Sequence, residues 1–278
     1  MFEDKNILKR EDYEEPNCPF CVDQYKNEKP VKSIDINRMI SKLDEYLDRD
    51  DFDSAQRHLD YWLGEARYGN DLRGELAIQN ELMGLNRRRK NREEADKAVA
   101  RGLELVEEIG LQGTETSATT FLNVATVYNS FDEPEKALDY YKKAESIYES
   151  VNVDKYKLGG LYNNMALAYG NSGNYDEAKK SFRKAIALME ELGNKLEEAI
   201  SYLNLVDVIQ AEIGEDGTSE EIDRYLDLAE QLLMDKDNKM DLYYAYVCDK
   251  CIPAFDYYGR FGIADELRKR EKEIYERT

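Results

Sequence analysis

Apolar residues recur along this chain at helical intervals, in two stripes separated by a short polar turn. Tyr162, Met165 and Tyr169 are spaced three and four residues apart, which is the spacing of one face of a helix. A polar turn follows at residues 171–174, and a second apolar stripe occupies residues 178–189. The pattern predicts two antiparallel helices that pack against each other along their apolar faces.

The same unit recurs over nearly the whole chain. Residues 118–147 align with residues 159–188, and the segment 245–274 ends in a similar way. Six marker positions, separated by 40 to 44 residues, are Ala55, Ala95, Ala137, Ala178, Ile222 and Ala264. Such a period indicates a repeat array, so we expect six helix pairs over residues 36–277 and no strand.

Two glycines close predicted helices at equivalent places in their repeats. Gly110 and Gly193 follow runs of two glutamates and one apolar residue. Glycine is the preferred residue for the left-handed position that ends a helix. We therefore expect both glycines to be left-handed C-caps.

Two copies carry aromatic and small residues at regular positions. In the fourth copy these are Tyr162, Tyr169, Gly173, Tyr175, Ala178, Phe182 and Ala185. In the third copy they are Phe121, Ala125, Tyr128, Ala137, Tyr141 and Ala144. These spacings resemble those of the tetratricopeptide repeat (TPR) family, whose usual unit has 34 residues. The longer unit and its Glu-Glu-Leu-Gly ends are similar to repeats of kinesin light chains and of bacterial quorum-peptide regulators.

The resemblance implies an all-α, right-handed superhelical solenoid of about six antiparallel helix pairs. This TPR-like domain would span residues 36–278, after a polar N-terminal tail at residues 1–35 that contains a C-x-x-C motif. It also implies a scaffold or adaptor that binds a protein or peptide in its concave groove. The alternative is a signalling receptor for a short peptide, for which residues 1–35 are too short to supply a separate effector domain.

Asparagines fall at groove-facing positions of the first helices in this register. Asn123, Asn164 and Asn204 occupy one equivalent position in three successive copies, Asn163 precedes Asn164, and Asn80 falls one place earlier in the second copy. Asparagine is unfavourable inside helices, and its carboxamide offers both a donor and an acceptor. We expect these residues to bind the main chain of an extended peptide. Polar surface residues or inter-helix hydrogen bonds are the alternative.

Two further features belong to the predicted groove. Arg87, in the one basic run at residues 87–90, would receive a ligand carboxylate; the alternative is an interaction with a helix C-terminus. Gly160 would face the groove and let a ligand backbone approach. The alternative for Gly160 is a helix that begins only at Leu161.

The charge balance narrows the choice of partner. With 39 basic and 59 acidic side chains, the formal net charge is -20. This charge disfavours nucleic acid and membrane surfaces and favours a basic or polar peptide, although it would serve solubility equally well. No apolar run approaches the roughly 20 residues of a membrane span, and no secretion leader is visible at the start, so we expect a cytoplasmic protein. The sequence does not indicate an oligomeric state.

All four cysteines occur in two C-x-x-C pairs. Cys18 with Cys21 and Cys248 with Cys251 would together supply the four sulfur ligands of a structural zinc. Alternatively, Cys248 and Cys251 take core positions of the repeat and act as small apolar residues. We expect no other cofactor.

The sequence contains no catalytic constellation. His58, the single histidine, is expected at the surface of a second helix. No glycine-rich phosphate loop or nucleophile elbow is present. We therefore expect no enzyme.

Overall fold

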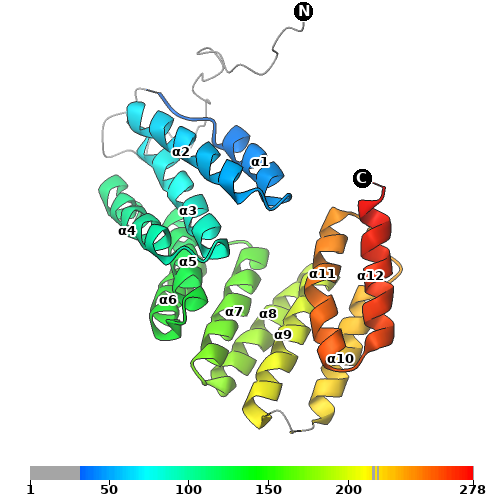
Figure 1. The fold of residues 1–278 in the computed structure, drawn as a ribbon. Coiled ribbons are helices and arrows are strands. Elements are labelled where there is room, and N and C mark those ends of the chain that lie inside the picture. The colour runs from blue at the N-terminus through cyan, green and yellow to red at the C-terminus, as the bar shows by residue number, and fades with distance from the viewer. Residues whose placement is uncertain (1–31, 215–216, 218, 278) are drawn as a thin grey trace, which may run out of the picture. The chain divides into compact units, whose positions relative to one another are not determined.

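The computed structural model describes residues 32–214, 217 and 219–277 (Figure 1). These residues form twelve α-helices and no strand, which confirms the predicted all-α fold of six sequential helix pairs. The chain divides into two compact units, Met1–Phe131 and Asp132–Thr278, which are described separately below as unit 1 and unit 2.

The described part of unit 1 contains five helices, each starting shortly after the previous one ends. Asp51 and Asp71 cap the second and third of them by accepting hydrogen bonds from backbone N–H groups in the first turn. Trp62, the one tryptophan of the chain, is buried in this unit. The helices are α1 (Ile36–Leu47), α2 (Phe52–Tyr68), α3 (Leu72–Arg88), α4 (Arg92–Ile109) and α5 (Glu115–Ser130).

Residues just before α1 pack onto unit 1. The Ile34 side chain is buried, and its backbone N–H donates to the Asp71 carboxylate at 2.9 Å. The Lys32 N–H donates to the carbonyl of Gly69 at 3.2 Å. Part of the sequence assigned to the tail is therefore attached to the repeats, whereas residues 1–31 lie outside the described residues.

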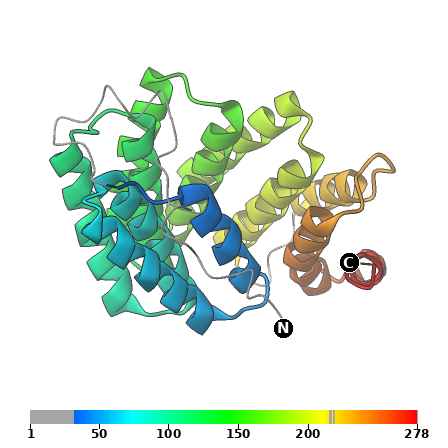
Figure 2. The same cartoon turned by 90° about the horizontal axis from the view of Figure 1, so that it is seen from above.

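Among the residues described in unit 2 there are seven helices, of which α7 packs on α8, α9 on α10, and α11 on α12 (Figures 1 and 2). The first helices of these pairs are neighbours, because α9 also contacts both α7 and α11. The helices are α6 (Pro134–Ser150), α7 (Lys155–Asn171), α8 (Tyr175–Leu192), α9 (Lys195–Ile213), α10 (Glu220–Leu233), α11 (Leu242–Tyr257) and α12 (Phe261–Tyr275).

The repeat markers explain how each second helix packs. All six lie near the start of a second helix, from α2 to α12, and all are buried. Five of the six are alanines that are completely inaccessible to solvent. A methyl side chain leaves room for another helix to come close, so the spacing read from the sequence records the positions of closest packing.

The predicted helix ends are confirmed at both glycines. Gly110 closes α4 with a φ of 76°, and Gly193 closes α8 with a φ of 65°. Both conformations are left-handed, where a side chain with a Cβ would be strained. The chain can therefore turn sharply into the next first helix.

The structure excludes the alternative for Gly160 and corrects the expectation about His58. The helix that contains Gly160 begins at Lys155, not at Leu161. His58 does not lie on the surface but is half-buried, with Nε2 at 2.9 Å from the carbonyl oxygen of Met39. Burial lowers the pKa of His58, so this imidazole is a neutral packing residue near neutral pH.

Candidate functional site

An open groove lies on the first helices of unit 2. It has a volume of about 570 Å³ and is lined by α7, α9 and α11. Its polar side chains include Asn163, Asn164, Asn204, Asp207 and Lys250. Three of the asparagines selected from the sequence are therefore brought together on one surface of this unit.

Two of these asparagines bind each other across neighbouring helices. The Nδ2 of Asn204 on α9 donates to the Oδ1 of Asn163 on α7 at 3.2 Å. Asn164 lines the same groove and makes no hydrogen bond within the described part of the chain. The sequence placed Asn164 at the position equivalent to Asn204, whereas the structure pairs Asn204 with the preceding residue.

Unit 1 contains a second pair of the same kind. The Nδ2 of Asn123 on α5 donates to the Oδ1 of Asn80 on α3 at 3.0 Å. The Nδ2 of Asn80 in turn donates to the carbonyl of Leu76 at 3.1 Å and to the hydroxyl of Thr120 at 3.3 Å. Both N–H groups of Asn80 are thus used within the unit, which makes Asn80 a residue that positions Asn123.

Each asparagine pair leaves some of its hydrogen-bonding groups without a partner. A carboxamide has two N–H donors and an oxygen that accepts two hydrogen bonds. Asn123 and Asn204 each spend one N–H on the earlier asparagine, and their oxygens have no partner among the residues the structure describes. The inter-helix hydrogen bond therefore coexists with one donor and one acceptor, which is what a peptide unit requires.

The floor and far wall of the groove come from α9 and α11. Of the residues that line these two sides, the sequence analysis had selected only Asn204 as a groove residue. The Tyr258 hydroxyl donates to the Asp207 carboxylate at 3.2 Å. Desolvation by the groove walls raises the pKa of Asp207, and this hydrogen bond opposes the rise. The Lys250 ammonium lies 4.4 Å from the centroid of the Tyr246 ring, a cation–π contact.

Pro253 stands inside α11 and lines the groove. Proline has no N–H, so the carbonyl of Asp249, one turn earlier, loses its usual helical donor. A helix-interior proline is a signal that is readable from sequence. Together with Lys250 and Tyr257 at seven-residue spacing, it could have identified α11 as a wall of the groove.

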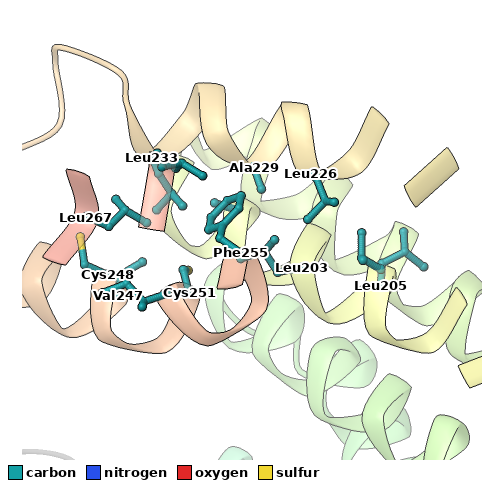
Figure 3. Packing of buried hydrophobic residues seen from close by; sticks show 14 of the residues in the cluster. Leu203, Leu205, Leu226, Ala229, Leu233, Val247, Cys248, Cys251, Phe255 and Leu267 are labelled. Atoms are coloured by element: carbon teal, nitrogen blue, oxygen red, sulfur yellow. The ribbon is translucent and has the colours of Figure 1, made fainter. Parts of the chain in front are cut away.

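Cys248 and Cys251 occupy core positions of unit 2. Both are essentially inaccessible and form no disulfide, and Figure 3 shows them among buried side chains that include Phe255 and Leu267. Burial raises the pKa of the Cys248 thiol to about 11 and raises the pKa of Cys251 as well. This environment suits the packing role.

The zinc site stays a prediction, because Cys18 and Cys21 lie outside the described residues. Within the residues that are described, no group of three or more histidine, cysteine, aspartate or glutamate side chains could hold a metal ion.

Arg87 lies half-buried in the last turn of α3, within unit 1. A cation there interacts favourably with the partial negative charge of the helix C-terminus. Its role as the receptor of a ligand carboxylate remains a prediction.

Across the described residues, none of the helices is long and apolar enough to cross a membrane.

One family model and two known proteins are similar to parts of this chain. Residues 158–222, from α7 to the beginning of α10, match the family model of the tetratricopeptide repeat. The Arabidopsis thaliana protein KINESIN LIGHT CHAIN-RELATED 1 is 32% identical over 81 residues, which cover 29% of this chain and 13% of that protein. The response regulator aspartate phosphatase E of Bacillus subtilis (strain 168) is 31% identical over 117 residues, which cover 41% of this chain and 31% of that protein.

A solved structure agrees with the fold over most of the length. The crystal structure of BtubC (BKLC) from P. vanneervenii matches with a TM-score of 0.55 at 15% identity, covering 87% of this chain and 92% of that chain. At this identity the likeness concerns the fold. The two sequence relatives are much longer than their matched parts, since this chain spans 13% and 31% of their lengths.

Proposed function

We propose that this chain, a tetratricopeptide-repeat protein whose repeats are similar to those of kinesin light chains and response regulator aspartate phosphatases, binds an extended polypeptide along its first helices. Domains built from these repeats typically bind proteins. In this proposal the chain acts as an adaptor or scaffold, and the groove of unit 2 holds the ligand main chain.

The main support for the proposal is the Asn204 carboxamide, which keeps one N–H donor and its oxygen acceptor free of partners among the described residues. Its carboxamide is fixed by Asn163 at 3.2 Å and still offers an acceptor and a donor at the wall of the groove. Because Asn163 already holds the side chain in place, little rotamer freedom is lost when a ligand binds. A peptide unit could be bound there whatever side chains it carries.

The charges near the groove support a polypeptide rather than a nucleic acid. The groove carries the Asp207 carboxylate, and the chain as a whole has a net charge of -20. A phosphate backbone would be repelled by both. A neutral or basic peptide would not.

The chemistry of the groove supports binding rather than catalysis. Cys251 is the one thiol among the groove-lining residues, and burial raises its pKa, so it stays a protonated thiol. The thiolate is the nucleophilic form of cysteine. The side chains that remain are carboxamides, apolar groups, the exposed Tyr257 phenol, a lysine in contact with a tyrosine ring, and the Asp207 carboxylate.

A second candidate is a receptor for a short signalling peptide. The similarity to a response regulator aspartate phosphatase over 41% of this chain favours this candidate. A receptor should bind a free peptide of a few residues as tightly as it binds the same segment within a folded protein. An adaptor should need the longer polypeptide.

The test is a double variant of the groove in unit 2, Asn164→Ala with Asn204→Ala. Each change would leave polar groups of the ligand unpaired and should cost about 1–3 kcal/mol of binding. The ligand would be a partner purified with the chain from its native host, and its dissociation constant would be measured by calorimetry. An unchanged dissociation constant in a folded variant would place the binding site elsewhere.

A further inference from the structure

Two tyrosines and a glutamate from the three first helices of unit 2 meet near the beginnings of those helices. The hydroxyl of Tyr156 on α7 donates to Oε1 of Glu197 on α9 at 3.5 Å, and the hydroxyl of Tyr243 on α11 donates to the same oxygen. Both tyrosine residues remain exposed to solvent, at 47% and 40%. One carboxylate is therefore held by two phenols on an accessible surface.

This cluster lies on the same face of α9 as the asparagine pair. Glu197, Ile200, Asn204 and Asp207 follow one another at intervals of three and four residues, which keeps them on one side of the helix. The last three of them line the groove. At 1.5 Å per residue, Glu197 lies about 10 Å along the helix axis from Asn204.

The Glu197 carboxylate has no basic partner among the described residues. Both of its hydrogen-bond donors are neutral phenols. Desolvation, together with the nearby glutamate, raises the pKa of Tyr156 and of Tyr243, so both phenols stay protonated. Lys250, the one cation among the groove-lining residues, lies over the ring of Tyr246. The charge of Glu197 is thus uncompensated on the face where the ligand would lie.

The surrounding rings add a second attraction for a cation. Tyr243 stacks on Tyr246 with a centroid distance of 6.4 Å, and Tyr246 already holds the Lys250 ammonium at 4.4 Å. The face of a tyrosine ring attracts cations through its quadrupole. A guanidinium or ammonium group beside Glu197 would therefore meet a carboxylate and aromatic surface together.

We infer that Tyr156, Glu197 and Tyr243 form a subsite for a basic side chain, arginine or lysine, of the peptide that the groove binds. The inference rests on the proposed function, since Asn204 would hold the main chain of the same ligand. A distance of about 10 Å corresponds to about three residues of extended chain. The ligand is an extended peptide with a basic residue about three positions from the peptide unit at Asn204.

The experiment selects ligands from a phage-displayed library of random twelve-residue peptides. The full chain and its Glu197→Gln variant would be used in parallel, because glutamine keeps an acceptor for both tyrosines and removes the charge. Glu190→Gln is the matched control, since Glu190 is an exposed glutamate on the second helix α8. We expect the full chain and the control to enrich peptides that share a basic residue at one position, and Glu197→Gln to lose that preference.

A peptide selected in this way then provides a test that needs no protein variant. Replacing its basic residue by norleucine keeps the aliphatic chain and removes the charge. The dissociation constant for the unchanged protein should rise at least tenfold. For Glu197→Gln, the same replacement should change it less than threefold. Equal losses on both proteins, or no loss on either, would overturn the subsite.

The two proposals fail in distinguishable ways. Selected peptides that depend on Asn204 but share no basic residue would overturn the subsite and leave the groove. If none of the three proteins, the full chain, Glu197→Gln and Glu190→Gln, enriches any peptide, the proposed function fails. The subsite is then decided by titrating Nα-acetylarginine methylamide into protein with ¹³C-labelled tyrosine rings. Shifts of Tyr156 and Tyr243 that disappear in Glu197→Gln support the subsite, and unshifted resonances contradict it.

Discussion

The two units contain the same asparagine pair in different surroundings. In unit 1, Asn80 is bound by Asn123, Leu76 and Thr120, so its N–H groups are used within the unit. In unit 2, Asn163 and Asn204 bind each other at the wall of a groove of about 570 Å³.

The different surroundings indicate a structural role for the pair in unit 1 and a binding role for the pair in unit 2. The shared feature is a hydrogen bond between neighbouring first helices, 43 residues apart in unit 1 and 41 in unit 2. What unit 2 adds is a wall from α11, which supplies Lys250 and Tyr257. An asparagine pair can therefore link neighbouring repeats in either unit. Ligand binding depends in addition on the side chains that α11 supplies to the groove in unit 2.

The largest effect is expected from a core substitution that lowers the free energy of unfolding of unit 2 but not that of unit 1. Phe255 is completely buried in unit 2, and Phe255→Ala should cost about 3–5 kcal/mol there. Trp62 reports on unit 1 through its fluorescence, whereas circular dichroism reports on all helices. Because repeats contact mainly their neighbours, the dichroism transition should shift much more than the fluorescence transition. Equal shifts would show that the chain unfolds as one cooperative body.

A pair of double variants tests the comparison itself. Asn163→Ala with Asn204→Ala should weaken peptide binding by about 1–3 kcal/mol for each bond lost to the ligand, or about tenfold for each 1.4 kcal/mol. Asn80→Ala with Asn123→Ala should weaken it much less, because Asn80 is engaged within unit 1. Isothermal calorimetry on both variants decides, and a larger loss from the unit 1 variant would reverse the assignment.

A smaller effect is expected at a buried charge in unit 1. Glu75 is only 4% exposed and accepts hydrogen bonds from Arg67 and Arg101 at 3.1 Å. Burial acts to raise the pKa of Glu75, but these hydrogen bonds outweigh it and hold the pKa below its ordinary range. Glu75→Gln should cost unit 1 about 1–2 kcal/mol at neutral pH, followed through Trp62 in urea.

The pH dependence of that cost has a defined sign. Because the pKa of Glu75 is lower in the folded state, its stabilisation is present above the ordinary glutamate pKa and disappears as the pH falls through the folded value. The difference between the unchanged chain and Glu75→Gln should therefore shrink below about pH 4. A difference that grows on acidification would contradict the hydrogen-bonding assignment.

The smallest effect concerns two helical glycines with open space around them. At Gly160 on α7 and Gly84 on α3, an added Cβ would have no heavy atom within 4 Å outside its own helical turn. Alanine at either site should stabilise its unit by up to about 1 kcal/mol. Gly160→Ala should also weaken peptide binding if the ligand backbone passes close to it, while Gly84→Ala should not. Binding unchanged by both would contradict the prediction that Gly160 faces the ligand.

The repeat register could be predicted because its signals are local. Ala137 and Ala178 mark helix contacts through their small size, and Gly110 and Gly193 mark helix ends through their backbone conformation. The partner of Asn204 could not be predicted so well. One residue turns a helix by about 100°, so the register alone did not decide which of the adjacent residues Asn163 and Asn164 faces Asn204.

The groove wall from α11 could not be predicted from a period. Glu197 lies 41 residues after Tyr156 but 46 residues before Tyr243, because the connections around α10 differ in length from those of other repeats. A fixed repeat length of 41 residues would therefore not have placed Tyr243 beside Glu197. Exposed tyrosines were also hard to separate from core tyrosines such as Tyr141, since both kinds recur at helical spacing.

The most direct test of the central claim is photo-crosslinking from the groove. The photoreactive residue p-benzoylphenylalanine would replace Asn164, which lines the groove, and in a second protein Glu190, on the second helix α8. Each protein would be irradiated with a selected peptide at saturating concentration, and the products would be identified by mass spectrometry. We expect a crosslinked peptide from position 164 and none from position 190. A crosslink from position 190 alone, or from neither position, would contradict it.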